Sequence, residues 1–479
     1  MTQAILRICV FLATMIHLQT AFSSPNFIVI LVDDLGWSSL STSMDKRSPD
    51  ARSDYYKTPN IDALIEMGMR FSNGYAASPV CAPTRYSLQF GKTPARIGIT
   101  RGLGPNNAKH DQIGIPQLLK RLDPRYRTAH LGKWHIDEDP SRYGYDLHDG
   151  ITKNKPGGFT LGNHKRQWKG YAEKDPKRIE SLTNRAIEFL RESVTQERPF
   201  FLQLSHYAVH SDIVFSDKSF DTTSTRLKGS LHSNAGYAAM LEDLDDSIGV
   251  FLQSFENLDL SSNTYIFFTS DNGGMPILPQ QTNLGMPYTS GLNSPLLRGK
   301  WDLTEGGIRV PFAVIGPGVE VNSQVDTPVV TYDILPTIYE LVSGSTDGLP
   351  EGLDGGSLID LITGKSEVVE RHSKYLVFHY PHYNRVGINE PHSSIRDGNI
   401  KLIHFPVSKR NLLFDLGADP GERNNLAVKQ KHLVDVLDYE LTNYLLLVDA
   451  ERPEEVFNWR TTGQSGRVRT HFFQRYEGK

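Results

Sequence analysis

The sequence is poor in cysteine, with only Cys9 and Cys81 among 479 residues. Cys9 falls in an amino-terminal segment that we expect to be removed, which would leave one cysteine and no internal disulfide. Stability must therefore come from a hydrophobic core. The chain is 38% hydrophobic and 10% aromatic, which is enough for one large domain, or for a large and a small one.

The sequence also lacks an excess of charge of either sign, with 51 basic and 55 acidic side chains and a net charge of −4. This balance gives no indication of a nucleic-acid partner or of a membrane surface. The sequence contains no internal repeat or low-complexity tract. No apolar run reaches the ~20 residues of a bilayer-spanning helix, so we expect no stable membrane insertion.

The amino-terminal segment has the features of a signal peptide. Arg7 precedes an apolar run at residues 8–16, and small residues suit cleavage near Ser23. A membrane anchor fits less well because the run is short, and a lipoprotein fits less well because Cys9 comes before the run has developed. We predict a signal peptide at residues 1–23 and an exported protein, periplasmic or secreted.

Short apolar runs alternate with helix-like stretches through residues 24–365, which we predict to be the large domain. This alternation predicts an α/β fold in which helices sandwich a large mixed, mostly parallel sheet. The predicted strands are 27–32, 128–131, 200–204, 266–269 and 312–315, and the predicted helices are 60–71, 115–122, 177–194, 237–255 and 334–342.

Beyond about residue 365 the pattern changes to short alternating strands, followed by an amphipathic helix at residues 431–448. We predict a smaller C-terminal α+β subdomain at residues 366–450, built on a small antiparallel sheet. Residues 451–479 form a basic, aromatic tail whose role the sequence leaves open.

Polar segments follow four of the predicted strands: "DDLGW", "GKWH", "SHYAVH" and "SDNGG". Ligands bind outside the carboxyl ends of strands in open α/β sheets, so we expect these segments to converge on one crevice. Each also has an ordinary explanation. The acidic pairs suit turns or helix caps, Lys133 and His135 suit one solvated face of an extended stretch, and His210 suits a structural role.

Asp33, Asp34, Asp271 and Asn272 form a set of oxygen ligands with no histidine or cysteine in the motifs. Adjacent carboxylates repel each other, and a bound cation removes that cost. Hard Ca²⁺ or Mg²⁺ suits such a set better than zinc does. We predict Ca²⁺ as the first choice and Mg²⁺ as the second.

Cys81 stands in the stretch "SPVCAPTRYSLQFG". Pro83 fits the first turn of a helix that continues through Phe90, which puts Cys81 at the helix N-terminus. Backbone donors and the helix dipole favour an anion there. Cys81 is therefore either a reactive thiolate or a small buried hydrophobe.

The pattern Cys81-x-Pro83-x-Arg85, followed by Gly91, resembles the signature of the type I sulfatases of the alkaline phosphatase-like superfamily. In that family the cysteine is oxidised after translation to Cα-formylglycine by a formylglycine-generating maturation enzyme. The resemblance covers most of the chain. Segments similar to family motifs occur in the expected order: "ILVDDLGW", "HLGKWH", "FTSDNGG", "LRGKWDLTEGGIRVPF" and "LLFDLGADPGERNNLA".

The resemblance implies a role for each candidate residue. Asp33, Asp34, Asp271 and Asn272 would bind the metal together with modified Cys81, Lys133, His210 and Lys300 would hold the sulfate, and Arg85 and His135 would position the modified residue. One hydroxyl of the aldehyde hydrate would attack sulfur, helped by Asp271 or Asp34. His210 or Lys300 would protonate the departing alcohol, and His135 would take the proton of the second hydroxyl.

Two positions depart from the family pattern. Thr84 stands where serine is commoner, which keeps a hydroxyl. Ser211 and Asp212 follow His210, where many members have a proline two places on. This second departure leaves His206 as an alternative to His210.

We therefore predict an exported sulfatase that hydrolyses sulfate monoesters, with a sulfated carbohydrate as the expected substrate. One alternative is a phosphonate monoester or phosphodiester hydrolase on the same scaffold, and another is a non-catalytic glycan-binding relative. His379, His382 and Tyr383 of the subdomain either border the crevice and touch substrate or are structural.

Overall fold

The computed structural model describes residues 24–101, 108–159, 170–275, 293–384, 387–388, 390–453 and 472–476. The predicted signal peptide lies outside the described residues, and so does most of the predicted tail. None of the helices within the described ranges has the length and apolar character needed to cross a membrane.

An eight-stranded mixed sheet forms the centre of the large domain, in the order β11-β2-β10-β9-β1-β7-β4-β5. β1 pairs in parallel with β7 and β9, β4 pairs in parallel with β7, and β10 runs antiparallel to β9. The strands of this sheet are β1 (Asn26–Val32), β2 (Met69–Phe71), β4 (Arg127–Gly132), β5 (Leu147–His148), β7 (Phe200–Ser205), β9 (Thr264–Ser270), β10 (Phe312–Ile315) and β11 (Ser323–Val325).

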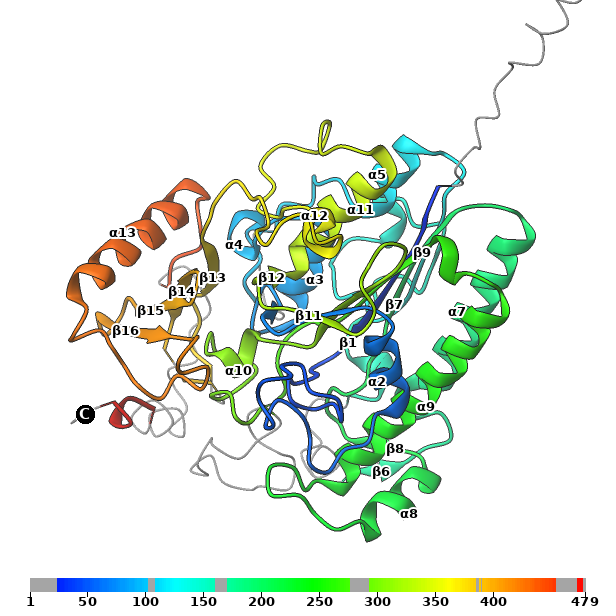
Figure 1. Cartoon of the computed structure of the whole chain (residues 1–479), viewed down its shortest axis with the longest axis horizontal. Helices are drawn as coiled ribbons and strands as arrows, with labels where there is room; N and C mark the ends of the chain where they lie inside the picture. Colours follow the sequence, from blue (N-terminus) through cyan, green and yellow to red (C-terminus); the bar gives the residue numbers. More distant parts are fainter. Residues whose placement is uncertain are drawn as a thin grey trace, which may run out of the picture.

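Helices cover both faces of this sheet because alternate side chains of its central strand point to opposite sides. Ile28 and Ile30 of β1 belong to a core with residues of α2, α7 and α9, whereas Phe27 and Val29 belong to a second core with residues of α3, α5 and α11. Figure 1 shows α7 and α9 on one side of the strands and α5 and α11 on the other. The α-helices of the large domain are α2 (Pro59–Glu66), α3 (Cys81–Phe90), α4 (Pro94–Ile97), α5 (Ile115–Leu122), α7 (Ile179–Thr195), α8 (Asp217–Thr225), α9 (Ala235–Asn257), α10 (Glu305–Ile308), α11 (Ile334–Ser343) and α12 (Ile359–Ile362).

Shorter elements connect these layers. Two small two-stranded sheets pair β3 with β12 and β6 with β8. The remaining elements are β3 (Gly74–Tyr75), β6 (Tyr171–Ala172), β8 (Val214–Phe215), β12 (Val329–Val330), and the 3₁₀ helices η1 (Pro140–Tyr143), η2 (Lys155–Gly157), η3 (Pro176–Arg178), η4 (Ser261–Asn263) and η5 (Thr331–Asp333).

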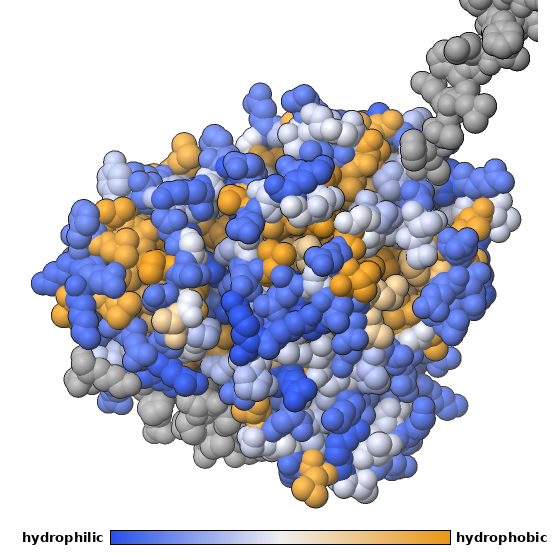
Figure 2. All heavy atoms as spheres, in the orientation of Figure 1, coloured by the Kyte–Doolittle hydropathy of each residue, from blue (hydrophilic) through white to orange (hydrophobic). Residues whose placement is uncertain are grey.

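The C-terminal part forms a separate layer at the left of Figure 1. Four antiparallel strands in the order β13-β14-β15-β16 make a small sheet, and α13 packs on it through Val434, Leu437 and Leu441. Figure 2 shows apolar residues gathered over this end of the molecule, where Leu446 and Leu447 of α13 are exposed. These elements are β13 (Leu376–Tyr380), β14 (His392–Asp397), β15 (Ile400–Phe405), β16 (Arg410–Asp415) and α13 (Lys431–Leu447).

The predicted fold class is confirmed, and one predicted helix is too long. The pattern predicted a helix over residues 60–71, but α2 ends at Glu66 and Met69–Phe71 form β2. Gly68 separates the two elements, and a Cβ atom there would lie 2.2 Å from the carbonyl oxygen of Val314. The close approach of β10, which pairs with β2, therefore fixes the end of the helix.

Candidate active site

The four polar segments lie at the carboxyl ends of neighbouring strands. Asp33 and Asp34 follow β1, and Asp271 follows β9, which pairs with β1. Lys133 follows β4, and His210 follows β7. The backbone N–H of Asp34 donates to Asp271 Oδ1 at 3.1 Å, so the two acidic segments meet directly.

Cys81 is the first residue of α3 and is 5% exposed. Val80 before it is extended, with φ −145° and ψ 149°, and Pro83 lies in the first turn as expected. α3 ends at Gly91 in the left-handed conformation, with φ 64°, as helices often do. The whole helix is buried, so the Cys81 side chain sits at a helix N-terminus enclosed by the protein.

Two buried lysines bind the acidic pair. Lys133 Nζ donates to Asp33 Oδ2 at 2.6 Å. Lys300 Nζ donates to both oxygens of Asp34, at 2.6 and 2.8 Å, and lies 3.3 Å from Cys81 Sγ. Cys81 Sγ is itself 3.9 Å from Asp34 Oδ1. Positive charge is therefore concentrated around the cysteine.

Arg85, one helical turn after Cys81, holds the neighbouring strand ends together. Its Nε donates to Asp271 Oδ2 at 2.8 Å, its Nη2 lies 2.7 Å from the same oxygen, and its Nη1 donates to the carbonyl oxygen of Lys133. Asn272 Nδ2 donates to Asp34 Oδ1 at 2.7 Å. Arg85 thus fixes Asp271 and the segment that carries Lys133.

Four of these side chains could hold a metal ion. Asp33, Asp34, Cys81 and His210 each offer one ligand atom, and all four atoms lie within 4.8 Å of one another. Asp33 Oδ1 and Asn272 Oδ1 are buried and accept no hydrogen bond from the described residues. A buried acceptor without a donor is costly, so two such oxygens beside an acidic pair fit a hard cation.

The three candidate histidines differ in their contacts. His210 Nε2 lies 3.8 Å from Asp34 Oδ2, and its Nδ1 contacts the carbonyl oxygen of Ser211. His135 Nδ1 is buried without a hydrogen-bond partner in the described ranges. His206, the alternative to His210, is buried but does not belong to the group around Cys81.

The surroundings shift the pKa values of the central groups. Burial raises the pKa of the Cys81 thiol to about 12, although Lys133 and Lys300 oppose the shift. Burial would also raise the pKa of Asp34, but the charge of Lys300 is the main cause that outweighs it and lowers that pKa. The raised pKa favours a neutral thiol over the thiolate interpretation for Cys81 as encoded.

Burial also keeps both histidines neutral. It lowers the pKa of His135 well below the usual value, and Lys133 and Arg85 add to this effect. Burial and Lys300 act in the same way on His210. Both imidazoles are therefore neutral, and the Nδ1 atom of His135 can still accept a hydrogen bond or a proton, because it has no partner among the described residues.

Two residues of the site have strained backbones. Asp34 has φ 62° and His135 has φ 59°, in the left-handed region that few residues other than glycine adopt. Such strain costs about 1–3 kcal/mol and concentrates at functional sites. The left-handed turn at His135 also ends the extended stretch in which Lys133 and His135 were expected to alternate.

The C-terminal histidines are held by the protein itself. His379 Nδ1 lies 2.7 Å from Ser393 Oγ, and its Nε2 lies 2.8 Å from the carbonyl oxygen of Glu451. His382 Nε2 lies 2.8 Å from Thr100 Oγ1. Together with their burial, these bonds favour the structural interpretation of both residues.

Sequence reasoning missed one charged neighbour of the site. Lys177 is 3% exposed, and its charge contributes to lowering the pKa of His210. The sequence placed it only at the start of a helix. At position 177 the sequence shows only a lysine that follows Pro176, and this pattern does not distinguish a buried lysine from a solvated one.

Comparison with known proteins agrees with this arrangement. Residues 25–345 match the family model for sulfatases, and residues 299–447 match the model for the C-terminal region of N-sulphoglucosamine sulphohydrolase. The N-acetylgalactosamine-6-sulfatase of Homo sapiens is 28% identical over 493 residues, which cover 91% of this chain and 88% of that protein.

Solved structures share the fold. The crystal structure of Ps i-CgsB in complex with k-i-k-neocarrahexaose matches with a TM-score of 0.72 and 24% identity, covering 95% of this chain and 99% of that one. The phosphonate monoester hydrolase of Agrobacterium radiobacter matches with a TM-score of 0.62 and 19% identity, covering 89% and 95%. The fold alone therefore does not decide which ester is cleaved.

The match to the sulfatase family model decides between the two kinds of ester. The sulfatase model spans more than half of the chain, and it includes the segments that carry Asp33, Cys81, Lys133, Asp271 and Lys300. The resemblance inferred from the C-x-P-x-R pattern is confirmed: the chain belongs to the sulfatase family and is a hydrolase of sulfuric esters.

Proposed function

We propose that this sulfatase is exported and removes sulfate from a sulfated carbohydrate, using a formylglycine made from Cys81 and a bound Ca²⁺. The names of two similar proteins support a carbohydrate substrate, since one is a sulfatase of N-acetylgalactosamine 6-sulfate and the other is in complex with a neocarrahexaose. Residues 1–23 support export, to the periplasm or the medium.

One observation carries the proposal. Cys81 lies at the N-terminus of α3, within 3.3 Å of the Lys300 ammonium and 3.9 Å of Asp34. A sulfate monoester is an anion, so a helix N-terminus with two buried lysines is a suitable place for it. A nucleophile at position 81 would then face the sulfur atom.

The proposed metal ligands are Asp33, Asp34, Asp271 and Asn272, together with modified Cys81. Asp33 Oδ1 and Asn272 Oδ1, which accept no hydrogen bond from the described residues, support this set. Carboxylate and amide oxygens favour Ca²⁺, with Mg²⁺ as the second choice. The bound cation would offset negative charge that develops on oxygen during the reaction.

Conversion of Cys81 to formylglycine is proposed because the neutral thiol is a weak nucleophile. The hydrated aldehyde would supply one hydroxyl to attack sulfur and a second hydroxyl whose proton would have to leave before sulfate is expelled. Pro83 and Arg85 would belong to the sequence that the maturation enzyme reads before the chain folds, because both are buried afterwards.

The remaining residues have roles that follow from their positions. Lys133 and Lys300 would bind sulfate oxygens in place of their present carboxylate contacts. Arg85 would position the modified residue and Asp271. His135 is neutral and has a free ring nitrogen, so it would accept the proton of the second hydroxyl.

The departing alcohol needs a proton from a group near position 81. His210 and Lys300 are the two candidates. Lys300 is the group in contact with Sγ, and the charge of Asp34 raises its pKa in spite of burial. His210 would bind a sulfate oxygen through Nε2, the ring nitrogen that lies 3.8 Å from Asp34 Oδ2.

We also propose that residues 24–365 form the catalytic domain and residues 366–450 the subdomain.

The test is the release of free sulfate from a panel of sulfated mono- and disaccharides. The protein is co-expressed with a formylglycine-generating enzyme, and mass spectrometry measures conversion at position 81. Cys81→Ala is the control. We expect sulfate release that disappears in the control. The substrate from which sulfate is released identifies the sugar.

Two results would overturn the proposal. Full conversion at position 81 without sulfate release from any carbohydrate, but with hydrolysis of a phosphonate monoester or phosphodiester, would favour the alternative hydrolase. Binding of a glycan by chain purified from its native host, with Cys81 entirely unmodified, would favour a non-catalytic relative.

A further inference from the structure

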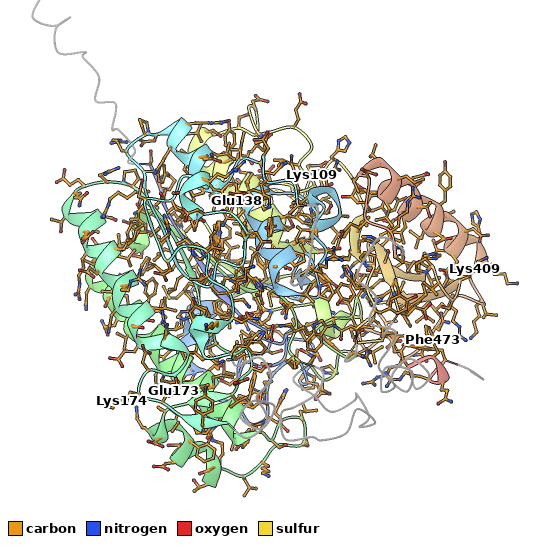
Figure 3. All side chains as sticks on the ribbon, turned by 180° about the vertical axis from the view of Figure 1, so that it is seen from behind. Lys109, Glu138, Glu173, Lys174, Lys409 and Phe473 are labelled. Carbon is orange, nitrogen blue, oxygen red and sulfur yellow. The ribbon has the colours of Figure 1, made fainter. Side chains whose placement is uncertain are left out.

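The described end of the tail, residues 472–476, packs on both parts of the molecule. Phe472 is 2% exposed and Phe473 is 5% exposed. Both rings belong to a hydrophobic cluster that contains residues of β15 and β16 and also Leu297 of the large domain. Figure 3 shows Phe473 at the lower edge of the C-terminal layer, below Lys409. These aromatic residues therefore reach the segment that leads to Lys300.

An ion pair closes the turn that carries Lys300. Arg298 Nε donates to Asp302 Oδ2 at 2.6 Å, and both side chains are fully buried. Lys300 lies midway between these two residues along the chain. Asp302 Oδ1 also accepts a hydrogen bond from the backbone N–H of Ile388 at 2.6 Å. The ion pair thus fixes the two ends of a turn whose middle residue places its ammonium 3.3 Å from Cys81 Sγ.

The backbone of this turn is strained on both sides of Lys300. Arg298 has φ 59° and Trp301 has φ 75°, in the left-handed region. Non-glycine residues keep such a conformation only where the surrounding structure holds them there. The position of Lys300 therefore depends on the groups that pack on the turn.

Phe472 is one of these groups. The guanidinium carbon of Arg298 lies 5.7 Å from the centroid of the Phe472 ring, within the range of a cation–π contact. A ring over the guanidinium also keeps water away from the ion pair, which strengthens it. Phe473, the next residue, instead lies over Arg410, whose guanidinium carbon is 4.4 Å from that ring centroid. Two adjacent phenyl rings thus contact different cations, and Arg298 is the one that belongs to the turn.

We propose that Phe472 is a positioning residue for the sulfatase reaction, which holds the ion pair across the turn and thereby keeps Lys300 beside Cys81. This inference rests on the proposed function, in which Lys300 contacts the sulfate. It gives the tail, whose role the sequence leaves open, a part in aligning the anion site.

The experiment is a double-mutant cycle in kcat/KM for sulfate release from the sugar of the panel that the wild type cleaves fastest. We expect Phe472→Ala to lower kcat/KM about tenfold, because a small displacement of a charged group at the reaction centre is costly. In the Lys300→Met background the same change should cost less than about twofold, since the group that Phe472 positions is already gone. A ring that supported only the fold would lower both values by the same factor.

Phe473→Ala is the matched control, because it removes the same ring from the same cluster. We expect it to shift the midpoint of urea unfolding about as much as Phe472→Ala does. Its kcat/KM per folded molecule should stay within about twofold of the wild type, since Arg410 lies outside the turn. Phe472→Leu keeps the apolar packing and removes the aromatic face. If Phe472→Ala does not fold, Phe472→Leu decides, and it must lower kcat/KM about threefold, only where Lys300 is present.

Equal losses in the two backgrounds, or a loss of activity in Phe473→Ala as large as that in Phe472→Ala, would overturn the inference and leave the proposed function standing. An unchanged kcat/KM in Lys300→Met would refute the proposed role of Lys300, and the inference with it. A wild type that releases no sulfate from any sugar of the panel refutes the proposed function itself.

Discussion

Two buried clusters of charge differ in how many of their carboxylate oxygens accept a hydrogen bond. In the active site, Asp33 Oδ1 accepts no hydrogen bond within the described part of the chain. In the interface cluster, which we define as Glu305, Lys401 and Glu422, all four carboxylate oxygens accept one. Lys401 donates to both glutamates at 2.8 and 2.9 Å, Tyr75 donates to Glu305 at 2.6 Å, and the backbone N–H of Glu305 donates to Glu422 at 2.7 Å.

This difference separates a structural cluster from a functional one. The interface cluster joins α10 of the large domain to β15 of the subdomain, and its charges satisfy each other. The active site keeps acceptors that take no hydrogen bond from the described residues, beside two buried lysines, an arrangement that a cation and an anion would complete. We therefore expect the cluster with unsatisfied acceptors, and not the interface cluster, to bind ligands.

Lys401→Met gives the largest expected effect. Removing this ammonium leaves two buried glutamates without their shared partner, which should lower the free energy of unfolding by about 3–5 kcal/mol. Urea unfolding measures the loss, and sulfate release per folded molecule should stay within about twofold of the wild type. A Lys401→Met protein with the same free energy of unfolding as the wild type would contradict the structural role of the interface cluster.

Lys300→Met is the matched change in the active site. We expect kcat/KM for sulfate release to fall by about 10²–10³, because the charge nearest position 81 is lost. The free energy of unfolding should fall by less than in Lys401→Met, since Asp34 keeps its bond from Asn272. Measuring both quantities on both variants makes the comparison direct, and a reversed order of the two effects would contradict it.

Chelation of the metal should lower the melting temperature. A cation present at a free concentration of 100 times its dissociation constant stabilises the folded state by about 2.7 kcal/mol. Calorimetry should show a lower melting temperature in EDTA, restored by Ca²⁺ at a lower concentration than by Mg²⁺. Asp33→Asn should abolish this sensitivity, whereas Lys401→Met should retain it.

The smallest effect concerns pH. Burial and the charge of Glu305 raise the pKa of Glu422 to about 7, while Lys401 helps to lower that of Glu305 to about 2, so Glu305 stays ionised throughout. A raised carboxyl pKa stabilises the fold below the unfolded value, and this contribution is lost as pH rises through 7. Between pH 5 and pH 8 the wild type should therefore lose on the order of 1 kcal/mol relative to Glu422→Gln.

That prediction is measured by urea unfolding at the two pH values. Groups shared by the two proteins cancel in the difference. A Glu422→Gln protein whose stability follows that of the wild type at both pH values would show that Glu422 does not titrate in this range.

Local patterns in the sequence predicted the elements that local patterns control. The strand at residues 312–315 is β10 without change, and the helix at residues 115–122 is α5. Both are short apolar segments bounded by glycine or proline, so periodicity and breakers suffice. At Met69–Phe71 the same apolar pattern failed, because pairing with β10, far along the chain, decided between helix and strand.

The candidate site shows the same limit. Motif order brought Asp33, Cys81, Lys133 and Lys300 into one hypothesis, and the structure brings them together. Motifs do not show that Arg85 bonds Asp271, 186 residues later, or that Lys177 is buried. The first depends on strand order and the second on a left-handed turn, and neither has a local signature.

The direction of β10 has a mechanical consequence. β10 runs opposite to its neighbour β9, so the segment that reaches the active-site edge precedes this strand, and it carries both Lys300 and Glu305. The backbone N–H of Trp301 also bonds the carbonyl oxygen of Pro79, just before Cys81. One short piece of chain therefore links the subdomain to the segment that carries Lys300. The packing of the C-terminal sheet on Glu305 thus helps to hold this segment in place.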